Sequence, residues 1–285
     1  MEKIKIALQR KGRLNEKSLE LLNEAGIEIN NGGGRLISGS SNFPVEILYL
    51  RDDDIPATVQ SGVADMGIVG QNIVNEKDAN ITFAEMLGFA RCRLSLAVPK
   101  HIGYSGISWF NGKEIATSYP RILSSYLKEN QLDARIVPIS GSVEIATGIG
   151  LADAVFDIVS TGSTLISNGL KEAEVVMLSQ AVVITNNDLS EGKKQTLGRL
   201  LFRIRAVKNA ANNKYILLNA PEKAIHEICD VIPGMKSPTI LPLAVPGWCS
   251  LHSVINENDF WNVTERLKEL GAQGILVVPI EKMII

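Results

Sequence analysis

The chain has only three cysteines and three histidines among its 285 residues, and this scarcity limits its chemistry. The cysteines lie far apart, show no metal-ligand spacing and are odd in number, which excludes a disulfide framework. They are Cys92, Cys229 and Cys249. A reducing, cytoplasmic compartment fits this usage best.

Long apolar runs and an excess of basic charge are also missing. No run approaches the roughly 18 apolar residues of a membrane span. The first ten residues become charged again after a short apolar stretch, so we expect neither a signal peptide nor a membrane anchor. The formal net charge is −2, which gives no overall basic field for nucleic acid or an acidic membrane.

The composition that remains is that of a globular protein. Hydrophobic residues make up 45% of the chain and charged residues 21%. A chain of 285 residues is long enough for two or three domains with ample core.

One stretch, from Glu144 to Leu165, carries most of the functional signal. Residues 154–159 form a short apolar run with β-branched residues, which predicts a buried strand broken only by Asp157. A loop rich in hydroxyl groups and one glycine follows, and a helical segment then starts at Leu165. The loop residues are Ser160, Thr161, Gly162, Ser163 and Thr164.

A strand, a Gly/Ser/Thr loop and a helix start in this order can hold an anion. Free backbone N–H groups point at the ligand, hydroxyls add donors, and Gly162 permits close approach. Asp157 is costly to bury without a partner, and a sugar diol or a magnesium ion would supply one. The alternative is an ordinary strand-to-helix turn. A dinucleotide site is excluded, because Gly148 and Gly150 precede the strand and Asp153 stands at the third position.

The same stretch resembles the signature of the ATP phosphoribosyltransferase family. The match fixes ten positions over twenty-two residues, and the likeness extends along essentially the whole chain, in the family's long form. The matching positions are Glu144, Gly150, Ala152, Val155, Asp157, Ile158, Thr161, Gly162, Thr164 and Leu165.

This resemblance implies a reaction and roles for the motif. N1 of ATP would displace pyrophosphate at C1 of phosphoribosyl pyrophosphate (PRPP), with Mg²⁺ as cofactor. Residues 160–164 would hold the 5-phosphate, and Asp157 the ribose hydroxyls, directly or through magnesium. Glu144 would lie near the ribose or adenine, or else cap a helix. A ring nitrogen is already a nucleophile, which agrees with histidines that lie outside every motif: His101, His226 and His252.

The resemblance also places ATP in the N-terminal part of the chain. A basic turn with Gln9, Gly12 and Arg13 follows the predicted strand 4–8, and Arg51 opens the string R-D-D-D-I-P after strand 45–50. One or two of these aspartates can cap the helix that starts near Pro56. The implied ATP-binding residues are Gln9, Gly12, Arg13, Arg35, Arg51 and Tyr119. Surface ion pairs for the arginines and ordinary packing for Tyr119 are the alternatives.

A short internal echo predicts two related lobes. Residues 65–74 match residues 157–166 as D-x4-G-x2 followed by two aliphatic residues, and each copy should place an acid in a strand and a glycine at the turn into a helix. A crossover strand, residues 87–99, would carry Arg91 and Arg93 toward one face. This agrees with the fold that the family resemblance implies, an α/β body like the type II periplasmic binding proteins. Residues 1–92 and 178–208 would form the ATP lobe, and residues 93–177 the PRPP lobe.

Residues 212–285 read as a separate unit. Predicted strands and helices follow each other as β-α-β-β-α-β, the ferredoxin-like order of a small α+β module. The resemblance implies an ACT-like regulatory domain that binds histidine as an inhibitor, with Thr239 and Gly274 at the effector site. It also implies a homo-oligomer, a dimer or hexamer.

Two other functions stay open on the residues alone. A cytoplasmic two-lobed ligand-binding or sensor module would share the lobes and the anion loop. Another PRPP-dependent transferase would usually show paired acids just before its phosphate loop, whereas here Asp157 stands alone four residues before Thr161.

Overall fold

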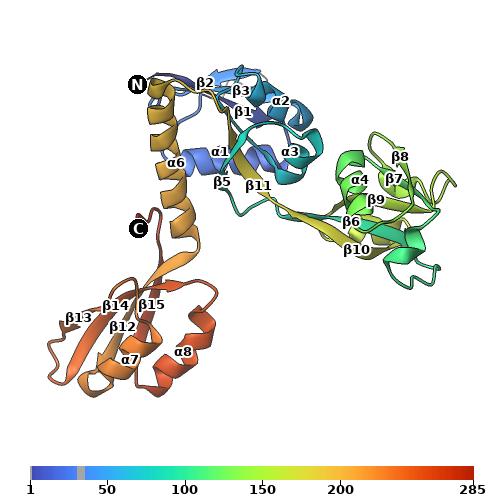
Figure 1. The fold of residues 1–285 in the computed structure, drawn as a ribbon. Coiled ribbons are helices and arrows are strands. Elements are labelled where there is room, and N and C mark those ends of the chain that lie inside the picture. Colours follow the sequence, from blue (N-terminus) through green and yellow to red (C-terminus); the bar gives the residue numbers. More distant parts are fainter. Residues whose placement is uncertain (1, 31–35) are drawn as a thin grey trace. The chain divides into compact units, whose positions relative to one another are not determined.

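The computed structural model describes residues 2–30 and 36–285, which form three β-sheets with helices packed on them (Figure 1). The chain divides into two compact units, Met1–Glu20 with Glu28–Leu197, and Leu21–Ile27 with Gly198–Ile285. The first unit contains two sheets. We call each sheet, together with the helices packed on it, a lobe: the six-stranded sheet forms the first lobe and the five-stranded sheet forms the second lobe. The second unit contains the third sheet, in the C-terminal domain.

The first lobe is built on a six-stranded sheet with the order β2-β3-β1-β4-β11-β5. Strand β1 is parallel to β3 and β4, while β11 returns from the second lobe and is antiparallel to β4 and β5. The strands are β1 (Ile4–Gln9), β2 (Ile37–Gly39), β3 (Val45–Leu50), β4 (Met66–Gly70), β5 (Thr82–Met86) and β11 (Ala181–Thr185). The helices are α1 (Arg13–Glu24), α2 (Ile55–Gln60) and α3 (Gln71–Lys77), with a 3₁₀ turn at Asp52–Asp54. Helix α6 (Glu191–Ala211) begins in the first unit and continues into the second, to which the last residues of α1 also belong.

The second lobe repeats this plan in a five-stranded sheet with the order β10-β6-β9-β7-β8. Strand β7 is parallel to β8 and β9, and β6 is antiparallel to β9 and β10. The strands are β6 (Cys92–Pro99), β7 (Glu114–Thr117), β8 (Arg135–Pro138), β9 (Ala154–Val159) and β10 (Leu170–Ser179). The helices are α4 (Pro120–Glu129) and α5 (Ser163–Ser167), with 3₁₀ turns at Ile107–Phe110 and Val143–Ile145.

Each lobe therefore has three parallel strands beside an antiparallel one, as expected of two related lobes. The echo itself is only partly right, because Asp65 lies before β4 and not inside it. Asp65 is 3% exposed, accepts a hydrogen bond from the Lys5 backbone and pairs with Lys193 at 2.9 Å, a structural role. The crossover strand is also shorter than predicted: β6 begins at Cys92, which leaves Arg91 outside it.

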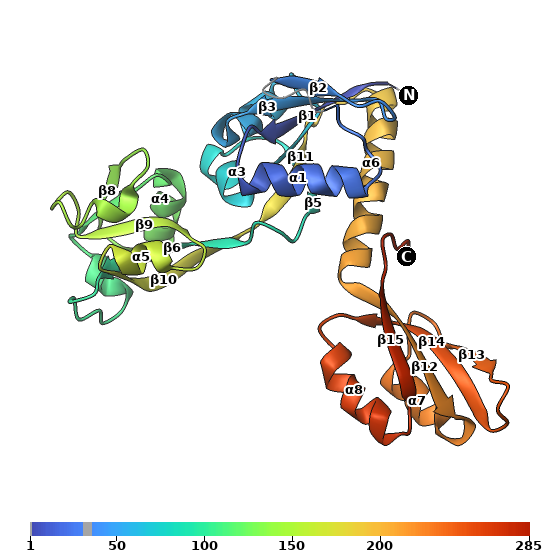
Figure 2. The ribbon, with the colours of Figure 1, turned by 180° about the vertical axis from the view of Figure 1, so that it is seen from behind.

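The C-terminal domain has the predicted ferredoxin-like topology. Its sheet has the order β13-β14-β12-β15, and each pair of neighbours is antiparallel. The elements are β12 (Asn213–Pro221), a 3₁₀ turn (Glu222–Ala224), α7 (Ile225–Val231), β13 (Thr239–Pro242), β14 (Trp248–Asn256), α8 (Phe260–Glu269) and β15 (Gln273–Pro279). Both helices cover one face of the sheet, where Ile216, Leu251, Ile228 and Leu267 share a core (Figure 2).

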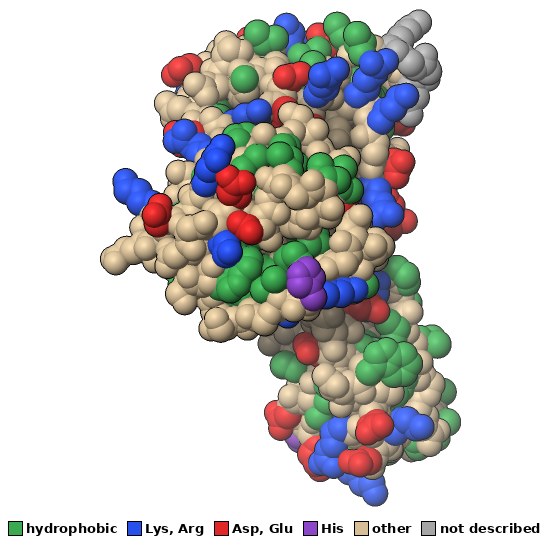
Figure 3. All heavy atoms as spheres, turned by 90° about the vertical axis from the view of Figure 1, so that its right-hand side faces the viewer, with side chains coloured by type: hydrophobic (Ala, Val, Ile, Leu, Met, Phe, Trp, Pro, Cys, Tyr) green, Lys and Arg blue, Asp and Glu red, His purple; other side chains and the backbone are tan. Residues whose placement is uncertain are grey.

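The surface mixes both signs of charge. Acidic and basic side chains are interspersed over the face shown in Figure 3, in agreement with the small net charge of −2. Among the residues that the structure describes, none of the helices has the length and apolar character needed to cross a bilayer.

Helix α2 packs closely on β4 at Gly67, so we predict that a larger residue at this position destabilises the fold. A Cβ at this position would lie 2.6 Å from Ile55 Cγ2 and 3.1 Å from Val59 Cγ2, so Gly67→Ala overfills the core. We expect a loss of about 1–3 kcal/mol in the free energy of unfolding, measured by denaturant titration. The control Gly198→Ala, in α6 with no atom within 4 Å of its Cβ, should leave stability unchanged or raise it. Equal stability of both variants would contradict this packing.

Candidate functional site

The candidate site lies at the carboxyl ends of the parallel strands of each lobe. In the second lobe, Thr117 at the end of β7 pairs in register with Pro138 of β8 and Phe156 of β9. The loops that follow these three strands therefore share one edge of the sheet, the usual place for ligands in open α/β sheets. Ser118 Oγ joins two of these loops, because it donates to the Ile139 carbonyl at 2.8 Å and accepts from the Gly141 N–H at 3.3 Å.

The loop after β9 presents its hydroxyl groups to solvent. Gly162 has φ +82°, a left-handed conformation that turns the chain from β9 into α5. The side chains of Thr161 and Ser163 are exposed, and their oxygens lie 3.0 Å apart. Leu165, the third residue of α5, is buried and anchors the loop to the lobe. The structure thus brings the predicted phosphate-binding residues together on one exposed turn.

Arg93 on β6 is hydrogen-bonded to the first residue of this loop. Its Nη1 donates to the Ser160 carbonyl at 3.2 Å, while Nε and Nη2 bind both oxygens of Glu172 at 2.5 and 2.7 Å. Glu172 also accepts from Ser95 Oγ at 2.6 Å, and the pKa of Glu172 is lowered, mainly by Arg93. Our reading of the sequence missed this role; the spacing of Arg91 and Arg93 in the crossover strand was the available signal.

Asp157 and Glu144, which belong to one motif in the sequence, lie near enough to interact electrostatically. Asp157 is half-buried within β9, and Glu144 belongs to the 3₁₀ turn Val143–Ile145. The pKa of Asp157 is raised to about 6, mainly by burial and to a smaller extent by the charge of Glu144, while a hydrogen bond from the Ile158 backbone acts in the opposite direction. Asp157 is therefore an acid that titrates close to neutral pH.

The first lobe gathers its candidate residues in the same way. Strands β1 and β3 end side by side, with Gln9 opposite Leu50, so the turn after Gln9 and the residue Arg51 leave from one edge. Gly12 has φ +100°, and α1 starts directly after it with the exposed Arg13. Arg51 is exposed as well. Arg35 lies outside the described residues.

Tyr119 connects the candidate residues of the second lobe with the first lobe. It precedes α4 in the second lobe, and its Oη accepts a hydrogen bond from Asn72 Nδ2 of the first lobe at 3.2 Å. The pKa of Tyr119 is raised above its ordinary value, first by burial and then by the negative charge of Asp157, with smaller contributions from Asp52 and Asp53. Its hydroxyl therefore lies within electrostatic reach of acids from both lobes.

The carboxylates fit a magnesium ion that is held mainly by substrate. In the part of the chain that the structure describes, no cluster of three or more His, Cys, Asp or Glu side chains could hold a metal alone. Mg²⁺ is commonly bound by one or two carboxylates together with substrate phosphates and waters. Asp157, with Glu144 nearby, could supply carboxylates of this kind.

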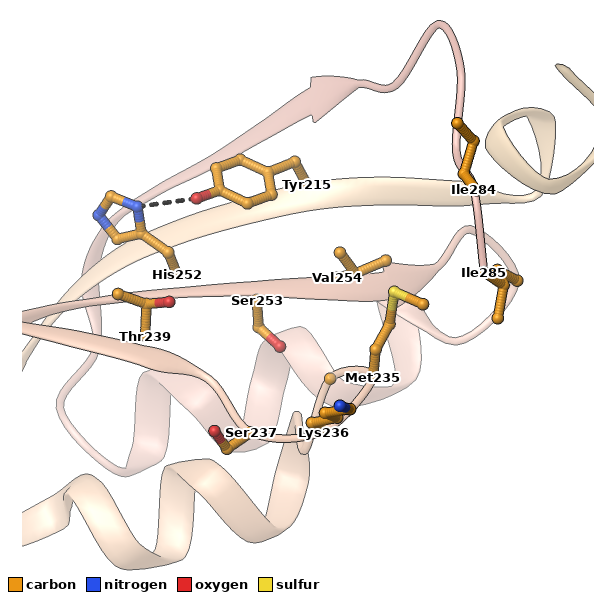
Figure 4. Close-up of a pocket in the computed structure, with 11 residues that line it drawn as sticks. Tyr215, Met235, Lys236, Ser237, Thr239, His252, Ser253, Val254, Ile284 and Ile285 are labelled. Atoms are coloured by element: carbon orange, nitrogen blue, oxygen red, sulfur yellow. Dashed lines mark hydrogen bonds between the residues drawn. The ribbon is translucent and has the colours of Figure 1, made fainter. Parts of the chain in front are cut away.

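A second candidate site is a cavity of about 540 Å³ in the C-terminal domain (Figure 4). Thr239 lines it, together with Tyr215 and His252 on the sheet face opposite the helices. Tyr215 Oη and His252 Nδ1 lie 3.1 Å apart, and His252 Nε2 lies 3.2 Å from Ser250 Oγ. Gly274 does not line this cavity; it lies on β15, at the opposite edge of the sheet from Thr239 on β13.

Comparisons with known proteins agree with this architecture. A family model described as ATP phosphoribosyltransferase matches residues 51–206, and one described as "HisG, C-terminal domain" matches residues 210–282. The chain is 58% identical to an ATP phosphoribosyltransferase of Bacteroides thetaiotaomicron over 282 residues, 99% of this chain and 100% of that protein. It is 56% identical to one from Cytophaga hutchinsonii, with 99% and 98% covered.

Solved structures extend the likeness to the fold. The ATP phosphoribosyl transferase (HisG:HisZ) complex from Thermotoga maritima contains a chain that is 28% identical, with a TM-score of 0.63 and 72% of this chain and 98% of that chain covered. A histidine kinase sensor domain similar to periplasmic binding proteins is 12% identical, with a TM-score of 0.50 over 73% of this chain and 91% of that chain, a likeness of fold alone. The fold class expected from the sequence is confirmed. On the family models and the full-length relatives, the chain belongs to the ATP phosphoribosyltransferase family.

Proposed function

We propose that the protein transfers the 5-phosphoribosyl group of PRPP to N1 of ATP, the first step of histidine biosynthesis. The N1 lone pair attacks C1 of the ribose as the C1–O bond to pyrophosphate breaks, and the products are N-1-(5-phosphoribosyl)-ATP and pyrophosphate. The observation that carries this proposal is the set of loops at the carboxyl ends of β7, β8 and β9, in a chain of this family.

The residues of the second lobe suit PRPP. The hydroxyls of Thr161 and Ser163 would donate to the 5-phosphate, and the carboxylate of Asp157 would accept from the ribose hydroxyls. ATP would bind along the first lobe, where Arg13 and Arg51 are exposed near the edge formed by β1 and β3. Catalysis would then rest on the alignment of the two substrates and on neutralisation of the leaving pyrophosphate.

Magnesium would assist that neutralisation. Asp157 would be the carboxylate that holds the ion, and the chemistry that Mg²⁺ would supply there is neutralisation of the negative charge on the pyrophosphate. The protein's part is to hold the carboxylate of Asp157 beside the ribose. The charge of Glu144 adds to the attraction for a cation there.

A direct assay tests the reaction. Release of pyrophosphate from PRPP should require ATP and Mg²⁺, and should cease in excess chelator. Orotate or free adenine should not replace ATP as acceptor. Binding of both substrates without release would favour the ligand-sensor alternative, and activity with orotate would favour another PRPP-dependent transferase.

The phosphate loop can be tested by one substitution. Thr161→Val removes the hydroxyl but keeps the shape, and the lost charge-assisted hydrogen bond is worth about 1.5–3 kcal/mol. We expect the KM for PRPP to rise by about 10–150-fold with little change in the KM for ATP. Thr264→Val on α8, whose hydroxyl donates to its own helix, is the control. An unchanged KM for PRPP would remove this loop from the site.

The raised pKa of Asp157 predicts a pH dependence. Activity needs the carboxylate, so kcat/KM for PRPP should fall as the pH drops through about 6. The folded-state pKa lies above the ordinary value of 3.8, so the ionised group opposes folding, and stability is lost as the pH rises through this window. Asp157→Asn should therefore lower activity at every pH and raise the Tm above about pH 7. A lower Tm for this variant would contradict the burial cost.

We further propose that histidine binds in the C-terminal cavity and inhibits the enzyme. A volume of about 540 Å³ accommodates a free amino acid, and Thr239, Tyr215 and His252 offer polar partners. Thr239 and Gly274 lie on opposite edge strands, three strand spacings or about 14 Å apart. One histidine could contact both only if a second copy of the chain contributed Gly274, which supports a homo-oligomer.

Two variants test whether histidine binds in this cavity and whether a second copy of the chain completes the site. Thr239→Leu should raise the histidine concentration for half-inhibition at least about tenfold, without changing the uninhibited rate. Gly274→Asn suits the backbone at φ +57° and should weaken inhibition only if two copies build the site. Full histidine inhibition of the Thr239→Leu variant would place the effector elsewhere.

A further inference from the structure

Asn72, the second residue of α3, is a buried polar side chain that none of the roles above includes. It is 4% exposed, and in the described residues every buried side-chain nitrogen and oxygen has a hydrogen-bond partner. Because an unpaired buried amide is costly, the partners of Asn72 indicate what it does.

The oxygen of the Asn72 amide is fixed by Ser179. Ser179 Oγ, at the end of β10 and 5% exposed, donates to Asn72 Oδ1 at 2.9 Å. Ser179 Oγ in turn accepts a hydrogen bond from the Asn72 backbone N–H at 3.1 Å. This reciprocal pair satisfies the hydroxyl and sets the amide orientation, so the NH₂ group of Asn72 faces away from Ser179.

The nitrogen of that amide faces Tyr119. Asn72 Nδ2 donates to Tyr119 Oη at 3.2 Å, which occupies a lone pair of the phenol. A phenol has one proton to donate, and Asn72 Nδ2 cannot accept it. The proton of Tyr119 is therefore directed toward another acceptor. Since the pKa of Tyr119 is raised, the phenol keeps this proton at neutral pH.

We infer that Asn72 is a positioning residue for phosphoribosyl transfer, which turns the O–H of Tyr119 toward an oxygen of the substrate bound beside Asp157. This inference rests on the proposed placement of the substrates between the two lobes. The chain of hydrogen bonds runs from Ser179, where β10 leads back to the first lobe, through Asn72 to Tyr119 in the second lobe. Tyr119 donates correctly only when both lobes hold this arrangement.

A double-mutant cycle tests the inference. In Asn72→Asp the carboxylate can still accept from Ser179, but it offers no donor to Tyr119 and attracts the phenolic proton to itself. We expect kcat to fall about tenfold, and to change less than about twofold when Asp is introduced in a Tyr119→Phe background. Asn75→Asp, the same change at an exposed position of α3, is the control and should leave kcat unchanged.

A purely structural role gives a different result. If Asn72 only joined α3 to β10, its substitution would lower Tm. The effect of that substitution on kcat would then be independent of Tyr119→Phe, and the two effects would multiply in the double variant. Either multiplied effects or an unchanged kcat overturns the inference. Ser179→Ala is the second variant: it frees the amide and should lower kcat in the same direction, only while Tyr119 is present. If Tyr119→Phe alone has no effect, the inference fails, whereas the response of Thr161→Val still reports separately on the PRPP loop.

Discussion

The position of the site depends on the parallel pairing of strands within each lobe. Strands that run in parallel all end at the same edge, and the loops that follow them must therefore meet there. In the second lobe β7 and β8 end in register and β9 continues to Val159 at the same edge, while in the first lobe β1 and β3 end in register. Segments that are dozens of residues apart in sequence, such as those with Tyr119 and Thr161, thus reach one place without long-range specification of each contact.

Burial of Asp157 is the main energetic tension in this arrangement. The residue interrupts an otherwise apolar strand, and desolvation raises its pKa to about 6. A neutral side chain would suit β9 better, so the carboxylate is retained against the preference of the fold. Its placement beside Glu144 adds repulsion that a cation or a set of sugar hydroxyls would relieve. Perturbed pKa values of this kind cluster at functional positions.

Local patterns predicted the elements well and their partners poorly. The apolar run before Gly162 and the turn itself could be read directly, because a buried strand and a left-handed turn leave local signals. The support of the loop by Arg93 depends on a glutamate about 80 residues away, and no pattern in one sequence predicts that pairing. Asp65 was expected inside a strand because the echo matched Asp157, yet its partner Lys193 assigns it a structural role. In the same echo Asn72 aligned with a residue of the phosphate loop, so a signal for its importance was present but lacked a mechanism.

Helix α6 extends without interruption from Glu191 to Ala211, and its residues belong to both compact units. The division between the two units therefore falls inside a regular helix and not in a loop. The twenty-one residues of this helix span about 31 Å. A helix bends sharply only where its backbone hydrogen bonds are broken, so a change of backbone direction at this division would cost helical hydrogen bonds that a loop does not have.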